Sequence, residues 1–152
     1  MSVAFRRESD EEHKEPRFER PIAPGPNRVT ERGRERIAAE VERLRAAVAQ
    51  MPAGEARDAP ARDLRYWTTR LTTAELVPPP EPGVAGFGST VRFRLAGTER
   101  RLTIVGGDEA DPDQGTVSFT APLARALGGA TADERVAFNG VEDALHVLSV
   151  SP

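Results

Sequence analysis

The apolar residues of this sequence change their period on the two sides of a proline-rich segment at residues 77–83. Before that segment, apolar side chains recur every three or four residues, which is typical of helices that pack along one face. After it, they alternate with polar residues, which is typical of half-buried β-strands. Because proline ends helices and stiffens a spacer, we expect the chain to divide there into a helical part and a sheet part.

Two helices are predicted before the spacer. The first runs from Thr30, a good N-cap residue, to Met51, and would be about 33 Å long at a rise of about 1.5 Å per residue. Pro52 and Gly54 end it, and a second apolar stripe begins beyond Pro60. Both stripes have heptad spacing, so we expect an antiparallel hairpin, a short coiled coil. The stripes consist of Ile37, Val41, Leu44, Val48 and Met51, and of Leu64, Trp67, Leu71 and Ala74.

Two β-hairpins are predicted after the spacer. Apolar and polar residues alternate over residues 91–95 and 102–104, and Gly97 separates the two runs. Asn139 followed by Gly140 is a strong hairpin-turn signal between two further strand-like segments. These features predict a small, mainly antiparallel sheet.

A single short helix interrupts the strands. Residues 116–119 read as a strand, and residues 120–128 carry a proline in the first turn and a glycine past the last, as a two-turn helix does. The predicted fold class is therefore α+β: an N-terminal antiparallel helical hairpin followed by a small antiparallel sheet domain with one short helix.

The charged N-terminal segment offers almost nothing apolar except Phe18 and Ile22, so burial cannot offset the entropy of ordering it. We therefore expect a disordered tail. The predicted organisation is a tail at residues 1–26, the hairpin at 27–77, a proline-rich linker at 78–86 and the sheet domain at 87–152.

Charge and cysteine content limit the classes of partner and compartment. The chain carries 21 basic and 24 acidic residues, so no global field attracts a nucleic-acid backbone, and any such contact is expected to be local or indirect. It contains no cysteine, which fits a reducing compartment. No apolar run resembles a secretory core or a membrane span. We expect a cytoplasmic protein without a membrane partner.

Four short motifs follow one another along the sheet region. They are Phe-Gly-Ser-Thr-Val at residues 87–91, Ile-Val-Gly-Gly-Asp-Glu-Ala-Asp at 104–111, Gly-Thr-Val-Ser at 115–118 and Ala-Pro-Leu-Ala-Arg-Ala-Leu at 121–127. Their order and spacing resemble the C-terminal domain of the GreA/GreB family of bacterial transcription elongation factors. The resemblance implies an FKBP-like fold that docks at the rim of the secondary channel of RNA polymerase, with nucleic acid contacted only indirectly through the transcription complex.

The resemblance also implies which residues contact the partner. The family's polymerase contact maps onto Phe119, Thr120, Ala121, Pro122 and Arg125. An exposed turn with a fixed proline, followed by a helix N-terminus, would offer rigid shape and unpaired backbone N–H groups to a partner. Threonine and proline also simply begin helices, so for any single residue both interpretations stay open.

The predicted hairpin tip departs from the family. In the cleavage factors, tip carboxylates help to hold a second Mg²⁺ in the polymerase active site. Residues 51–60 lack that motif, and only Glu55 and Asp58 remain as acidic candidates. The hairpin is also shorter by roughly ten residues per helix, or about 15 Å of reach, and Mg²⁺ needs its ligands within about 2.1 Å. We expect occupancy of the channel entrance without strong stimulation of transcript cleavage; a genuine cleavage factor using Glu55 and Asp58 is the alternative.

No motif indicates enzyme chemistry, a cofactor, a metal or a small-molecule substrate. The acidic loop before Gly115 loosely suggests a calcium site, but it lacks the bidentate glutamate, so a connecting loop is preferred. His13 and His146 are too isolated to form a metal site, and His146 is expected on a strand face. No nucleophile elbow surrounds any serine. The acidic residues of the loop are Asp108, Glu109, Asp111 and Asp113.

Two functions of other classes remain as alternatives. An FKBP-like prolyl isomerase would need an aromatic-lined pocket, and fold analogy alone does not license that activity. A general adaptor could use Tyr66 and Trp67 as anchors, although the position of Trp67 on the heptad seam favours packing inside the hairpin. The sequence leaves open the angle between hairpin and sheet domain. The aromatic residues of the sheet domain are Phe87, Phe93, Phe119 and Phe138.

Overall fold

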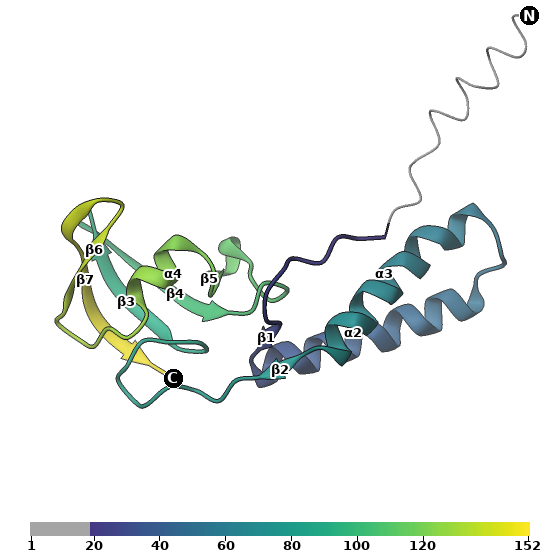
Figure 1. The fold of residues 1–152 in the computed structure, drawn as a ribbon, viewed down its shortest axis with the longest axis horizontal. Helices are drawn as coiled ribbons and strands as arrows, with labels where there is room; N and C mark the ends of the chain where they lie inside the picture. Colours follow the sequence, from purple (N-terminus) through teal and green to yellow (C-terminus); the bar gives the residue numbers. More distant parts are fainter. Residues whose placement is uncertain (1–18) are drawn as a thin grey trace, which may run out of the picture.

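The structure, a computed structural model, describes residues 19–152, so most of the predicted tail at residues 1–26, with Phe18 and His13, lies outside the described residues. A helical hairpin and a sheet domain lie end to end, with the hairpin projecting from one side of the sheet domain (Figure 1). None of the helices in the described part is long and apolar enough to span a bilayer. The predicted α+β class is confirmed.

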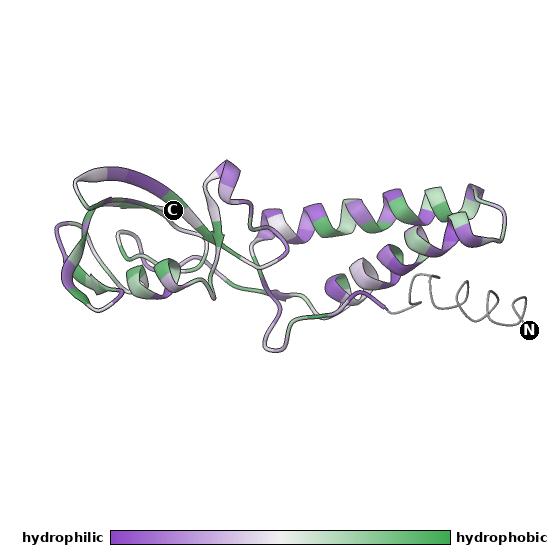
Figure 2. Cartoon of the chain, turned by 90° about the horizontal axis from the view of Figure 1, so that it is seen from above, coloured by the Kyte–Doolittle hydropathy of each residue, from purple (hydrophilic) through white to green (hydrophobic). Residues whose placement is uncertain are grey.

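The first helix of the hairpin, α2 (Glu31–Gln50), agrees with the sequence-based prediction to within one residue at each end. The Thr30 hydroxyl caps it by accepting a hydrogen bond from the Gly33 N–H at 2.9 Å. Hydrophobic and hydrophilic residues alternate around the helices, as Figure 2 shows. The buried apolar residues of α2 are four of the five predicted ones, namely Ile37, Val41, Leu44 and Val48.

The second helix, α3 (Glu55–Thr72), begins before Pro60 and not beyond it, which corrects the sequence-based prediction. Gly54 precedes it with a φ of 151°, a backbone conformation that glycine adopts freely. Pro60 is inside the helix and cannot donate to the carbonyl of Ala56, but Ala56 is exposed, so water can satisfy that carbonyl. The hairpin tip is therefore only residues 51–54.

The five-stranded sheet has the order β5-β4-β3-β7-β6. All neighbouring strands are antiparallel except β4 and β5, which are parallel, so the sheet is mainly antiparallel, as expected, with one parallel pair. The reason is the connection after β4, which crosses back through a 3-10 helix, η1 (Pro112–Gln114), before β5 begins. The strands are β3 (Thr90–Leu95), β4 (Thr98–Val105), β5 (Thr116–Ser118), β6 (Arg135–Phe138) and β7 (Val141–Ser151).

One face of the sheet is covered by the short helix α4 (Pro122–Leu127) (Figure 1). Alternate residues of β3, β4 and β7 point to this face and form one apolar cluster with α4. Phe93, Leu127 and Leu145 are its largest fully buried side chains. The opposite face is largely solvated and carries His146 on β7, as predicted.

A second, two-stranded sheet, which was not predicted from the sequence, joins the start and the end of the hairpin. β1 (Arg28–Val29) and β2 (Glu75–Leu76) pair in parallel. The Glu75 N–H donates to the carbonyl of Asn27 at 2.8 Å, which closes the hairpin at its base. This pair lies where the hairpin meets the sheet domain (Figure 1).

Residues just before β1 lie against helix α3. Glu19 accepts hydrogen bonds from both the Nε and a terminal nitrogen of Arg65, the shortest at 2.7 Å. The Arg20 guanidinium lies 3.9 Å from the centroid of the Tyr66 ring. Ile22 is exposed.

Candidate functional site

The segment between β5 and α4 is a surface turn held by its own hydrogen bonds. The Phe119 N–H donates to the Val105 carbonyl at 2.8 Å, and the Ala121 N–H donates to the Ser118 carbonyl at 2.9 Å. The Ser118 hydroxyl accepts from the Thr120 N–H at 3.2 Å. These bonds hold the backbone of the turn in one conformation.

The structure brings the five predicted partner-binding residues together on this turn and the first turns of α4. Thr120, Pro122 and Arg125 are exposed, whereas Phe119 and Ala121 are half-buried and pack against the apolar core. Pro122 is at the first position of α4, where its missing N–H is not needed by the helix. The five residues, which we call the docking segment, therefore combine exposed side chains with a rigid backbone.

Arg28 of strand β1 reaches the docking segment from the base of the hairpin. Its guanidinium lies 5.4 Å from the centroid of the Phe119 ring, within the range of a cation–π contact. The Phe119 ring also meets the Phe87 ring edge to face, with 5.6 Å between centroids. Sequence reasoning missed Arg28, because nothing near it in the chain indicates a partner 91 positions away.

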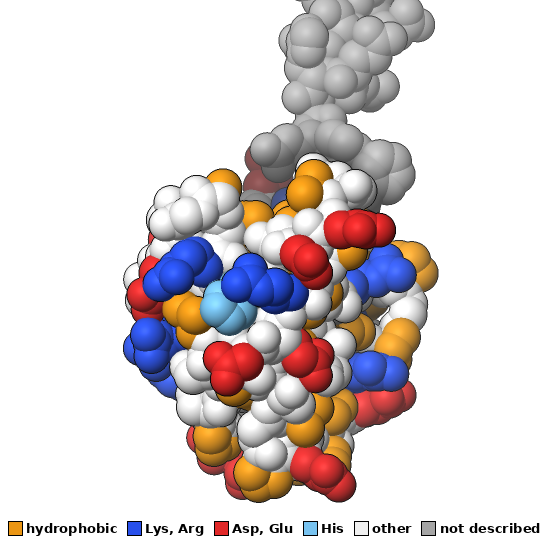
Figure 3. Space-filling model, turned by 90° about the vertical axis from the view of Figure 1, so that its left-hand side faces the viewer, with side chains coloured by type: hydrophobic (Ala, Val, Ile, Leu, Met, Phe, Trp, Pro, Cys, Tyr) orange, Lys and Arg blue, Asp and Glu red, His pale blue; other side chains and the backbone are white. Residues whose placement is uncertain are grey.

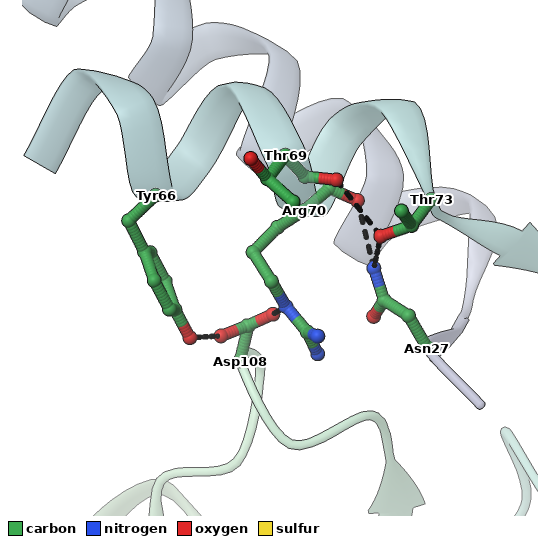
Figure 4. Close-up of polar contacts among 6 residues, drawn as sticks. All are labelled: Asn27, Tyr66, Thr69, Arg70, Thr73 and Asp108. Carbon is green, nitrogen blue, oxygen red and sulfur yellow. Dashed lines mark hydrogen bonds and ion pairs between the residues drawn. The ribbon is translucent and has the colours of Figure 1, made fainter. Parts of the chain in front are cut away.

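The hairpin is joined to the sheet domain by a half-buried polar cluster centred on Asp108 (Figure 4). Its two carboxylate oxygens accept hydrogen bonds from the Tyr66 hydroxyl and from Arg70 Nε, each at 2.5 Å. The side chains of Arg70 and Asp108 are only 10% and 11% exposed, so the ion pair is shielded from water. The Asn27 amide donates to the Arg70 carbonyl at 2.7 Å and secures the end of α3.

Burial raises the pKa of the Tyr66 phenol above its usual value, and the hydrogen bond to Asp108 raises it further. The phenol therefore remains a neutral donor under ordinary conditions. The residues Tyr66, Arg70 and Asp108, which we call the junction cluster, link helix α3 to the loop after β4.

A second polar link lies beside the junction cluster. The Thr30 hydroxyl, which caps α2, donates to a carboxylate oxygen of Glu109 at 2.8 Å. Gly106 lets the loop approach closely, since a Cβ there would lie 2.2 Å from the Arg28 carbonyl oxygen. The loop that loosely resembled a calcium site is thus a connecting loop whose first two acids hold the hairpin. The glycine pair before Asp108 was the one sequence signal of this close approach.

The two acidic candidates at the tip, Glu55 and Asp58, lie in the first turn of α3 and are both exposed. Acidic residues at a helix N-terminus also stabilise the helix dipole, which accounts for them without a metal. Across residues 19–152, no group of three or more potential metal ligands is present. The tip is at the far end of the hairpin from the docking segment (Figure 1), so the fold does not bring the two sets of candidates together.

Comparison with known proteins matches the sheet domain to one family. The family model "Transcription elongation factor, GreA/GreB, C-term" covers residues 79–152. GreB of Pasteurella multocida is 37% identical over 78 residues, which is 49% of this chain and 49% of that protein. GreA 1 of Lactiplantibacillus plantarum is 30% identical over 90 residues, 58% of each chain. The chain thus matches about half the length of these curated relatives.

One solved structure matches this chain with low similarity. A GreA/GreB elongation factor from Nitrosomonas europaea superposes with a TM-score of 0.41 at 24% identity, over 85% of this chain and 100% of that one. The matched relatives are named as elongation factors and not as enzymes. The domain at residues 79–152 therefore matches the C-terminal domain of the GreA/GreB family of transcription elongation factors.

Proposed function

We propose that this chain binds bacterial RNA polymerase through the docking segment, Phe119, Thr120, Ala121, Pro122 and Arg125, at the rim of the secondary channel. The family match supports the kind of partner, because it covers the whole domain that carries the segment. The observation that carries the proposal is the rigid, exposed turn between β5 and α4, which presents its side chains without a folding step on binding.

The hairpin would enter the channel at an angle set by its base. The junction cluster and the Thr30–Glu109 hydrogen bond fix α2 and α3 to the loop after β4. Arg28 connects the same base to Phe119 of the docking segment. A partner that holds the docking segment would therefore also position the hairpin.

We propose that the bound chain occupies the channel entrance and does not strongly stimulate transcript cleavage. α2 has 20 residues and is about 30 Å long, which limits how far the tip can reach. The tip itself, residues 51–54, contains no acidic side chain. A chain that occupies the channel in this way would alter the access of nucleotides or of other channel-binding factors.

The alternative, a genuine cleavage factor, rests on the exposed pair Glu55 and Asp58. These residues are three positions apart on a helix, so their carboxylates project from the same face. The alternative predicts that the chain alone releases short RNA from backtracked transcription complexes. Our proposal predicts little or no release, and release that is lost in the Glu55→Gln, Asp58→Asn variant would favour the alternative.

Binding is tested with labelled full-length chain and bacterial core RNA polymerase, by measuring the dissociation constant. The variant Arg125→Glu is expected to weaken binding by about tenfold or more, as charge reversal at the centre of an interface does. Arg100→Glu, which reverses the charge of another exposed arginine, on β4, is the matched control and is expected to bind like the wild type. Absence of association at micromolar concentrations, or equal losses in both variants, would overturn the proposal.

A further inference from the structure

The end of the sheet domain remote from the hairpin contains a hollow of about 710 Å³. It lies between the turn that joins β3 to β4 and the turn that joins β6 to β7, and none of the docking-segment residues lines it. Figure 3 looks at this end of the molecule, where basic side chains gather around a histidine. The hollow would therefore stay accessible while the docking segment is occupied.

Three residues on one face of the sheet form a row beside the hollow. Arg94 on β3 is directly opposite His146 on β7, and His146 is directly opposite Arg135 on β6. Opposed residues of neighbouring strands have Cβ atoms only about 5 Å apart on the same face, so two guanidinium groups flank one imidazole. We call these three residues the arginine–histidine row.

The two arginines of the row have no counterion of their own. Within residues 19–152, the side chains of Arg94 and Arg135 form no hydrogen bond or ion pair, although both line a hollow that also contains acidic residues. Arg92, two residues before Arg94 on the same face, pairs with Glu99 at 2.7 Å. The two guanidinium groups lie on either side of β7, so both can approach an anion placed over this face of the sheet. The row is thus suited to an external carboxylate.

Part of the hollow is apolar, which favours one class of ligand. Leu95, Phe138 and Val141 line it, and Val141 is 59% exposed, the most exposed large apolar residue in the described part of the chain. A ligand that carries both an acidic group and an apolar side chain would satisfy the row and cover this surface together.

Two acidic residues of the hollow, Glu142 and Asp143, argue against a nucleic acid. Both line the same hollow and would repel a continuous chain of phosphates. A peptide differs, because it can place its acidic side chains at the row and uncharged residues beside these two carboxylates. We propose that the hollow binds an acidic, apolar-containing peptide segment of a second protein, through bidentate contacts from Arg94 and Arg135 to its carboxylates.

The proposal is tested by fluorescence anisotropy with the full-length chain and a labelled ten-residue peptide in which Asp alternates with Leu. We expect saturable binding that weakens with added salt. The Arg94→Glu, Arg135→Glu variant is expected to bind at least about tenfold more weakly, since it removes both charge-assisted contacts. Both arginines are exposed, so the variant should keep its fold, which circular dichroism verifies.

Controls separate this site from general attraction to basic residues. The Arg100→Glu, Arg101→Glu variant changes the net charge equally on exposed residues of β4 that do not line the hollow, and is expected to bind the peptide like the wild type. Val141→Asp is expected to weaken binding while leaving all arginines in place. Equal loss in both arginine pairs, equal binding of a Lys-for-Asp peptide, or tighter binding of a twelve-nucleotide single-stranded DNA would overturn the proposal.

Discussion

The sheet domain and the hairpin are stabilised in different ways. The sheet domain buries apolar side chains from β3, β4, β7 and α4 in one cluster, so it supplies both sides of its own core. In the hairpin, the buried apolar side chains of the described chain come from α2, while the one buried residue of α3 is Arg70. Helix α3 therefore depends on polar contacts with the loop after β4 as well as on its half-buried stripe.

This difference predicts which substitutions should destabilise each region. A domain with a two-sided apolar core tolerates changes at its surface and fails when the core is opened. The hairpin, in contrast, should be destabilised when the polar contacts at its base are removed. Trp67 on α3 is the one tryptophan of the chain, so its fluorescence reports the hairpin, whereas β-sheet circular dichroism reports the other region.

The largest effect is expected for Phe93→Ala in the sheet domain. Phe93 is 1% exposed, and removal of a buried phenylalanine side chain lowers the free energy of unfolding by about 3–5 kcal/mol. Urea unfolding followed by circular dichroism measures this loss. Phe138→Ala, at a half-buried position, is the control and should lose less. A loss below about 1 kcal/mol for Phe93→Ala would contradict a single apolar core.

Asp108→Ala should produce the next largest effect, and should act on the hairpin. It leaves the buried Arg70 guanidinium without its partner, and breaking such a pair typically lowers the free energy of unfolding by about 3 kcal/mol. The urea midpoint of Trp67 fluorescence is the measurement. Asp113→Ala, which changes an exposed acid of the same loop, should shift it far less. If the two variants behaved alike, the junction cluster would have no special role.

Thr30→Ala should weaken the hairpin base more modestly. It removes the N-cap of α2 and the hydrogen bond to Glu109 at once, for a loss of about 1–2 kcal/mol. Thr30→Ser keeps the hydroxyl and should recover most of this loss in the same fluorescence titration. Failure of serine to rescue would show that the methyl group, and not the hydrogen bonds, holds the base.

The smallest effect concerns the free energy of unfolding at alkaline pH. The pKa of Tyr66 is raised in the folded protein, so its contribution is fully present below the unfolded pKa of about 10 and is lost as pH rises through the folded pKa. Above about pH 10, the wild type should therefore lose stability more steeply than Tyr66→Phe. Unfolding midpoints of both proteins, measured at several pH values, test this. If the midpoints of the wild type and of Tyr66→Phe fell in parallel with pH, Tyr66 would not contribute to the pH dependence of stability.

Local patterns were enough to predict most elements. The stripe of α2 follows from side chains three and four residues apart, and the β6–β7 turn follows from Asn139 and Gly140. Because of Pro60, the start of α3 was predicted too late in the sequence. A proline in the second turn leaves only one carbonyl without its helical hydrogen bond, and water can satisfy that carbonyl, so the helix tolerates it. The parallel pairing of β5 depends on how a loop crosses, which strand periodicity does not encode.

The contacts that join the two regions could not be predicted in this way. Asp108 contacts Arg70 and Tyr66, which are 38 and 42 residues away in the sequence. An acidic residue after two glycines is also common in surface loops, so the local sequence does not indicate these contacts. The docking segment differs, since a resemblance between motifs located it. Its role stays a prediction, because the fold explains its exposure and rigidity without identifying what binds there.

Competition on the polymerase tests the central claim most directly. Backtracked complexes would be incubated with a cleavage-competent GreB-type factor and increasing amounts of this chain, and the released RNA would be measured. The account predicts that the chain releases little RNA by itself and suppresses release by the factor, and that Arg125→Glu suppresses it far less. Release that is unaffected by saturating amounts of the wild-type chain would contradict a shared docking site at the secondary channel.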